Sequence, residues 1–161
     1  MKKKLQKLLK NQKGLTLVEL LAVVVILGII AAIAVPSIAN IIDNSKKDAH
    51  VANAQQMISA ARLAVAANDV DAVDDNKITL DELIKGGYID ESLVDPDTNI
   101  AYENPDTASF VSIVTTTETT SGNDKITTSK PEYKVTLKGK KRGITGESSG
   151  NLTKDGRKLV K

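Results

Sequence analysis

The sequence predicts an α+β fold in which one long N-terminal helix is followed by a small antiparallel β-sheet. Residues 15–68 are first continuously apolar and then amphipathic with a helical period, and Pro36 alone interrupts this pattern. Farther along, two segments at about 108–117 and 131–139 are rich in β-branched residues, and the turn-rich sequence ETTSGNDKITTSK separates them. The chain therefore changes from a helical to a strand-like pattern, which favours a sheet in its C-terminal part.

The composition excludes several classes of functional site. The chain has no cysteine and no tryptophan, one phenylalanine and three tyrosines. Disulfides and thiolate metal sites are therefore excluded, and a small aliphatic core does not favour a buried small-molecule pocket. We expect the one histidine, His50, to be solvated or packed on a helix face and not to serve in a catalytic triad or a histidine-based metal cluster. We expect a chain that is not an enzyme and that uses no cofactor.

The N-terminus carries a short basic segment followed by an apolar run. Residues 1–14, MKKKLQKLLKNQKG, contain six lysines and no acid. Residues 15–35 contain one charge, Glu19, and at a rise of about 1.5 Å per residue they are long enough for a hydrocarbon layer of about 30 Å. Lysines on the N-terminal side predict a cytoplasmic N-terminus and an external C-terminal part.

Three ordinary interpretations of this segment remain open. A secretory signal peptide would be cleaved near AIA at residues 32–34, although the apolar run is longer than such signals usually have. A plain signal anchor fits the length but gives no reason for Glu19, because a charge near the bilayer midplane costs about 2.5–3.5 kcal/mol. A buried core helix would need more covering chain than the remaining residues supply.

The junction GLTLVE at residues 14–19 resembles the class III signal of type IV pilins and pseudopilins. This signal consists of a basic leader ending in glycine, then a hydrophobic residue, Thr-Leu, an aliphatic residue and glutamate, before a long apolar helix. Gly28 and Pro36 also stand where family members often carry glycine and proline, whereas Leu15 replaces the more usual phenylalanine. The detailed resemblance covers about residues 10–36. It implies that a prepilin peptidase cuts between Gly14 and Leu15 and methylates the new amine of Leu15.

The resemblance also gives Glu19 a role. Cleavage creates a positive amine on Leu15, four residues before Glu19, and an amine–carboxylate pair offsets much of the cost of burying the carboxylate among apolar helices. In the family the amine belongs to a neighbouring subunit, so that the pair sets the axial register. There are two alternatives. In the first, Glu19 pairs with the Leu15 amine of its own chain. In the second, the Glu19 carboxylate only extends to the membrane interface.

Gly28 and Pro36 are the weak points of the apolar helix. Proline lacks the N–H that would bond four residues back, and glycine has a low helix propensity. By resemblance to family filaments, we expect residues 28–36 to kink or melt during assembly. A simple kink within the membrane is the alternative.

The expected organisation follows from these readings. A pilin-like chain would consist of a removed leader, a membrane-spanning or filament-core helix, an amphipathic continuation of that helix and a small globular head, at residues 1–14, 15–42, 43–68 and 69–161. Within the head, Thr79 and Glu82 have capping-box spacing and predict a short helix at 79–86 that ends at a glycine pair. The sequence SGND at 121–124 predicts the tip of a hairpin between the two strands.

Two further segments are candidate binding sites. Asp95, Asp97 and Asn99 alternate as calcium ligands do, but Ile100 stands where the turn glycine of an EF-hand is needed, so turn formation is the preferred interpretation. The sequence KGKKRG at 138–143 could contact nucleic-acid phosphates. It has no interleaved aromatic residues for base stacking, so a solvated sheet edge is preferred over DNA binding.

The functional expectation is a structural subunit that polymerises with its own kind and with minor pilins. By resemblance, the filament serves adhesion, motility, DNA uptake or secretion, and its assembly requires a platform protein and an ATPase. The competence subunits of Gram-positive bacteria commonly carry a cysteine pair, so the absence of cysteine counts against that branch. The subunit would cross the cytoplasmic membrane once before assembly, with its head outside. The alternative is a single-pass membrane-anchored surface or ligand-binding protein that never polymerises.

Overall fold

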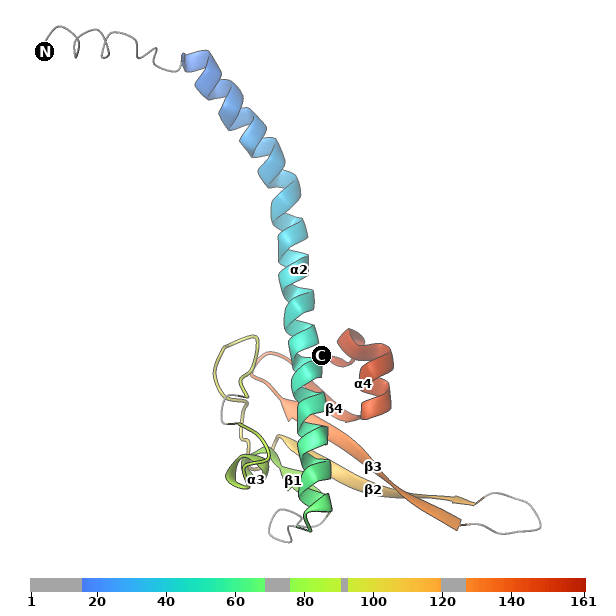
Figure 1. Cartoon of the computed structure of the whole chain (residues 1–161). Coiled ribbons are helices and arrows are strands. Elements are labelled where there is room, and N and C mark those ends of the chain that lie inside the picture. The colour runs from blue at the N-terminus through green and yellow to red at the C-terminus, as the bar shows by residue number, and fades with distance from the viewer. Residues whose placement is uncertain (1–15, 69–75, 91–92, 120–126) are drawn as a thin grey trace, which may run out of the picture. The chain divides into compact units, whose positions relative to one another are not determined.

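A computed structural model describes residues 16–68, 76–90, 93–119 and 127–161 of the chain (Figure 1). It confirms the predicted α+β, pilin-like layout: a long N-terminal apolar helix whose later part packs on a four-stranded antiparallel sheet. The leader, the Gly14–Leu15 junction and the expected hairpin tip at 121–124 lie outside the described residues.

Helix α2 extends over Leu17–Ala66 and includes Pro36. The contacts of the chain divide it into two units, Met1–Ile42 and Asp43–Lys161. In the first unit, the described apolar side chains are exposed, with Leu17 at 81% and Ile33 at 71% of their maximal exposed area. In the second unit, one face of α2 is buried and forms part of the core.

The sheet of the second unit has the strand order β1-β2-β3-β4, and every neighbouring pair is antiparallel. The strands are β1 (Lys77–Thr79), β2 (Phe110–Thr119), β3 (Thr127–Lys138) and β4 (Gly143–Ser148). Opposite Val111 of β2 lie Ile78 of β1 and Val135 of β3.

The strands differ from the expected segments in position and in number. Strand β3 begins at Thr127, before the expected 131–139, and includes Pro131 opposite Thr115. Because β4 pairs with β3 only from Lys134 onward, Pro131 lies where β3 is locally an edge strand, which is compatible with a missing N–H. The short β1 lies in a part of the chain for which we expected no strand.

The core lies between α2 and the sheet (Figure 1). The helix contributes mostly small side chains, and the sheet contributes β-branched and leucine side chains. Alanines on the helix leave room for a close approach of the two layers, which suits a chain with few aromatic residues. The fully buried members at the centre of this core are Ala54, Met57, Ala61, Ala64, Ile78, Val111, Val135 and Leu137.

Two short helices complete the unit. Helix α3 (Leu80–Lys85) begins with the expected capping box between Thr79 and Glu82 and ends at Gly86. Gly87 follows with φ 73°, a conformation that glycine adopts at little cost. After β4 the chain forms α4 (Ser149–Asp155) and a 3₁₀ turn, η2 (Gly156–Leu159), and buries Leu152 and Val160.

Candidate functional site

Helix α2 begins with a capping box that fixes Glu19. The backbone N–H and the hydroxyl of Thr16 both donate to Glu19 Oε2, at 2.8 and 2.9 Å, and the Glu19 N–H donates to Thr16 Oγ1 at 3.2 Å. The positive end of the helix dipole also favours a carboxylate in the first turn. Glu19 is therefore held at the helix start by hydrogen bonds within its own chain.

The surface of α2 that follows Glu19 is almost entirely apolar and uncovered. By length and composition, α2 is a helix that can cross a membrane. No residue in its most apolar 18-residue segment is buried. An apolar surface of this extent marks contact with lipid or with other protein chains. A Cβ added at Gly28 would meet no atom within 4 Å, so contacts within the chain do not require glycine there.

A comparison with known families identifies this segment. Residues 9–35 match the prokaryotic N-terminal methylation motif. The match includes the Gly14–Leu15 junction, Glu19 and Gly28, and it ends one residue before Pro36. The motif is the class III signal of type IV pilins, and it implies a prepilin-type substrate of prepilin peptidase. Searches of curated proteins and of solved structures gave no match.

The methylation motif and the apolar helix together fit a chain that is anchored in a membrane and then enters a filament. The motif is typical of structural subunits. The positions of Gly14 and Leu15 lie outside the described residues, so cleavage and methylation there remain predictions.

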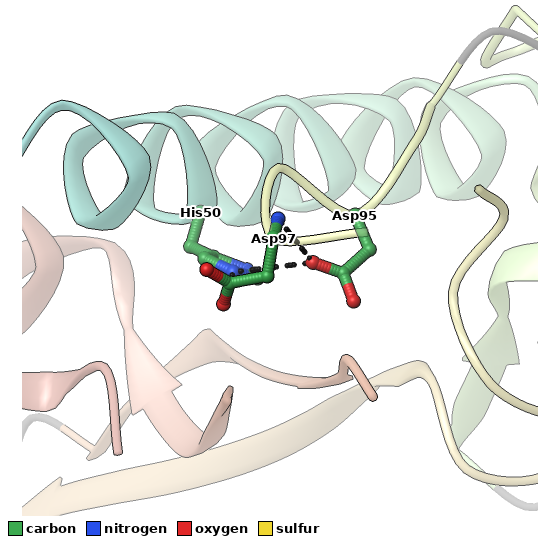
Figure 2. A group of neighbouring side chains, drawn as sticks. All are labelled: His50, Asp95 and Asp97. Carbon is green, nitrogen blue, oxygen red and sulfur yellow. Dashed lines mark hydrogen bonds and ion pairs between the residues drawn. The ribbon is translucent and has the colours of Figure 1, made fainter. Parts of the chain in front are cut away.

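A second cluster of polar side chains joins α2 to the loop after α3. Figure 2 shows His50, from the helix, facing Asp95 and Asp97, from the loop. His50 Nε2 lies 3.3 Å from Asp97 Oδ2 and 3.5 Å from Asp95 Oδ1. His50 and Asp95 are fully buried, so His50 is a packed residue and not a solvated one. These three residues form the one group of potential metal ligands found among the described residues.

Arg142, from the turn between β3 and β4, closes the cluster. Its Nε and Nη2 donate to the two carboxylate oxygens of Asp97 at 2.8 and 2.5 Å, and its Nη1 donates to Asp43 Oδ1 at 2.6 Å. The hydrogen bonds that Arg142 donates hold the pKa of Asp97 well below its usual range, and the same bonds raise the pKa of Arg142. The Asp97 side chain is only 2% exposed, so Arg142 supplies the charge that a buried carboxylate requires.

The remaining hydrogen bonds of the cluster assign a proton position to His50. Asn53 Nδ2 donates to the Tyr102 hydroxyl at 2.9 Å, which leaves that hydroxyl free to donate to His50 Nδ1 at 3.1 Å. His50 Nε2 then carries the proton and donates to Asp97 Oδ2. Burial raises the pKa of Tyr102, which keeps its hydroxyl protonated. Every polar ring atom of His50 therefore has a partner.

This donor set fits a structural network better than a cation site. Both oxygens of Asp97 accept from Arg142, and Asp95 accepts from the N–H groups of Asp97 and Lys140, at 2.8 and 2.9 Å. A divalent cation would have to replace these donors and lie beside a guanidinium group. Asn99, the third residue of the candidate calcium loop, is exposed with φ 57° and lies outside the group of potential ligands. The hydrogen bond from Asp97 N–H to Asp95 is the turn chemistry that the sequence favoured.

Sequence reasoning did not single out several of these residues, among them Thr16, Asn53, Tyr102 and Arg142. Thr16 and Glu19 have the same Thr-x-x-Glu spacing as Thr79 and Glu82, so a signal for the capping box of α2 was present. Arg142 lies 45 residues from Asp97 and 99 residues from Asp43, and no local pattern links these positions.

Proposed function

We propose that this chain is a structural subunit that loses residues 1–14, is methylated on Leu15 and polymerises into a type IV pilus-like filament. The observation that carries this proposal is the methylation motif at residues 9–35, which leads into a helix with an uncovered apolar surface. In the filament, residues 15–42 form the apolar core, and the unit from Asp43 onward forms the surface. The partners are copies of this chain, minor pilins, prepilin peptidase, and a platform protein with its ATPase.

Glu19 is the assembly residue in this proposal. In the single subunit, the Thr16 N–H and hydroxyl satisfy its carboxylate. Among packed helices, a second partner with a full positive charge offsets the cost of burial far better than two neutral donors do. We assign this partner to the Leu15 amine of a neighbouring subunit, because a contact between chains would also fix their axial register. The alternative partner is the Leu15 amine of the same chain.

Residues 28–36 supply the flexibility that assembly needs. Gly28 makes no packing contact that requires its lack of a side chain, and Pro36 leaves one carbonyl of α2 without its helical N–H partner. Loosening of the helix here would lengthen the apolar segment as it leaves the membrane. The cost of melting is lowest where the helix propensity is lowest.

The test compares two substitutions of Glu19 by electron microscopy of sheared surface material. Glu19→Gln keeps an oxygen that can accept from Thr16 but removes the charge, whereas Glu19→Ala removes both. We expect both variants to lose filaments while the chain remains in the membrane, because the amine requires a charged partner.

Glu82→Gln is the matched control, since Glu82 makes the same capping box at α3. It should leave filament yield unchanged. Native filament yield from Glu19→Gln would show that the charge is dispensable and would overturn the role given to Glu19. A native chain that is inserted and abundant, yet never found in filaments, would favour the non-polymerising surface protein instead.

A further inference from the structure

A basic hollow lies at the turn between β3 and β4. Its volume is about 420 Å³. The acidic residues in its lining are Glu103 and Glu147. The basic residues in its lining are Arg142 and four lysines, Lys138, Lys140, Lys141 and Lys161. We call this feature the basic hollow.

The positive charge of the basic hollow is mostly unpaired. Arg142 is committed to Asp43 and Asp97. Among the residues that the structure describes, no carboxylate lies within ion-pair distance of the ammonium groups of the four lysines. Lys140 and Lys141 are exposed at the tip of the turn. A cluster of unpaired ammonium groups around a concave surface attracts an anion.

The lining of the hollow points to a ligand recognised by charge. No aromatic side chain lines it, so it offers no platform on which a nucleic-acid base could stack. Lysine binds phosphate as a point charge, without the planar geometry that arginine imposes. The chemistry therefore suits single phosphate groups that approach from a surface.

Only a short length of chain separates the residues around the hollow from the apolar run. Arg142 is bonded to Asp43, which follows the end of the apolar run at Val35 by eight residues. These residues belong to α2, and at helical rise they span about 12 Å. Lys46 and Lys47 lie one helical turn after Asp43 and are paired with Asp97 and Asp43, respectively. The positive charge that remains for an anionic ligand is therefore that of the four lysines of the hollow.

We propose that the basic hollow binds the phosphate groups of anionic phospholipids in the leaflet that the head faces, before the subunit enters a filament. This inference rests on the membrane-anchored state in the proposed function, but it does not require polymerisation. Each lysine near an anionic surface adds about a fivefold preference for the bound state. Contacts of this kind hold the head on the membrane and must be released when the subunit is extracted.

The test measures the reactivity of lysines in the full chain, reconstituted in nanodiscs of phosphatidylcholine with or without phosphatidylglycerol. An amine-reactive reagent and mass spectrometry give the labelling rate of each lysine. We expect phosphatidylglycerol to slow the labelling of Lys140 and Lys141 about fivefold. Lys85, which is exposed on α3 and does not line the hollow, should label equally fast in both membranes.

The variant Lys140→Gln/Lys141→Gln should lose the protection that phosphatidylglycerol gives to Lys138 and Lys161. The charge-matched variant Lys77→Gln/Lys85→Gln should keep it. Equal labelling rates in the two membranes, or protection that survives Lys140→Gln/Lys141→Gln, would overturn the proposal. Protection in phosphatidylcholine nanodiscs by inorganic phosphate or by a short DNA duplex, without an effect of phosphatidylglycerol, would also overturn it, in favour of a soluble phosphate ligand or of DNA.

The two proposals fail separately in these experiments. If Glu19-dependent filaments form but phosphatidylglycerol gives no protection, only the lipid contact is wrong. If protection occurs but the chain is never cleaved or polymerised, only the filament function is wrong.

Discussion

Thr16 and Thr79 each begin a helix by the same exchange of hydrogen bonds with a glutamate three residues later. At Thr79 the sequence pattern predicted the capping box directly. At Thr16 the glutamate was interpreted only through the amine that cleavage creates. The capping box supplies neutral partners for the Glu19 carboxylate that do not depend on that amine.

Arg142 is the residue on which the buried polar cluster depends. Arg142→Ala would leave the buried Asp97 carboxylate without its two guanidinium hydrogen bonds and with only the more distant Lys46 ammonium, 3.9 Å away, which we expect to lower the free energy of unfolding by about 3 kcal/mol. Chemical unfolding of the solubilised chain, followed by circular dichroism, measures this change. Arg157→Ala is the control, because the Arg157–Asp48 pair is about half exposed and should contribute little.

The same substitution should change how stability depends on pH. The pKa of Asp97 is lowered in the folded chain, so its contribution is fully present above the unfolded pKa of about 3.9 and is lost as pH falls toward the folded pKa. The native chain should therefore lose stability steeply below about pH 4. Arg142→Ala should flatten this decline, and a decline as steep as the native one would contradict the assigned pair.

At the scale of elements, the sequence predicted those with strong local signals. The long helix follows from its apolar and amphipathic pattern, and α3 follows from the capping box and Gly86-Gly87. Strand β1 was missed because three residues carry too short an alternation to identify, and its pairing partner Val111 is 33 residues away from Ile78. Helix α4 was missed because Ser149 and Gly150 favour loops. The burial of Leu152 and the N-cap hydrogen bond from the Asn151 N–H to the Ser148 hydroxyl stabilise it.

The capping box of α3 gives a test at this scale. Thr79→Ala removes the hydroxyl that accepts from the Glu82 N–H, and we expect it to lower the free energy of unfolding by about 1 kcal/mol. Thr79→Ser keeps the hydroxyl and should be close to the native chain. Equal losses in both variants, measured by denaturant unfolding, would show that the methyl group of Thr79 matters and the cap does not.

At the scale of the whole molecule, the chain combines a unit with its own core and a helix segment without one. The unit Asp43–Lys161 contains the whole buried core, whereas the described apolar side chains up to Ile42 are exposed. The contacts that hold the loop at Asp95 and Asp97 to His50 and to Arg142 could not be predicted, because they join segments far apart in the sequence and form only when the sheet and helix have packed.

We expect the fragment 43–161 to fold as a soluble monomer. It keeps the core, and Asp43 is a favourable residue for the new helix N-terminus. Circular dichroism and size-exclusion chromatography would measure this. The fragment should be unable to form filaments, and an aggregated or unfolded fragment would show that the core depends on residues before Asp43.

The central claim is that the chain is a processed subunit whose first residue is Leu15. Mass spectrometry of the N-terminus of the protein isolated from its native cell tests this claim most directly. The account predicts a chain that begins at Leu15 and carries a methyl group on its amine. A chain that retains residues 1–14, or one cleaved near residues 32–34, would contradict it.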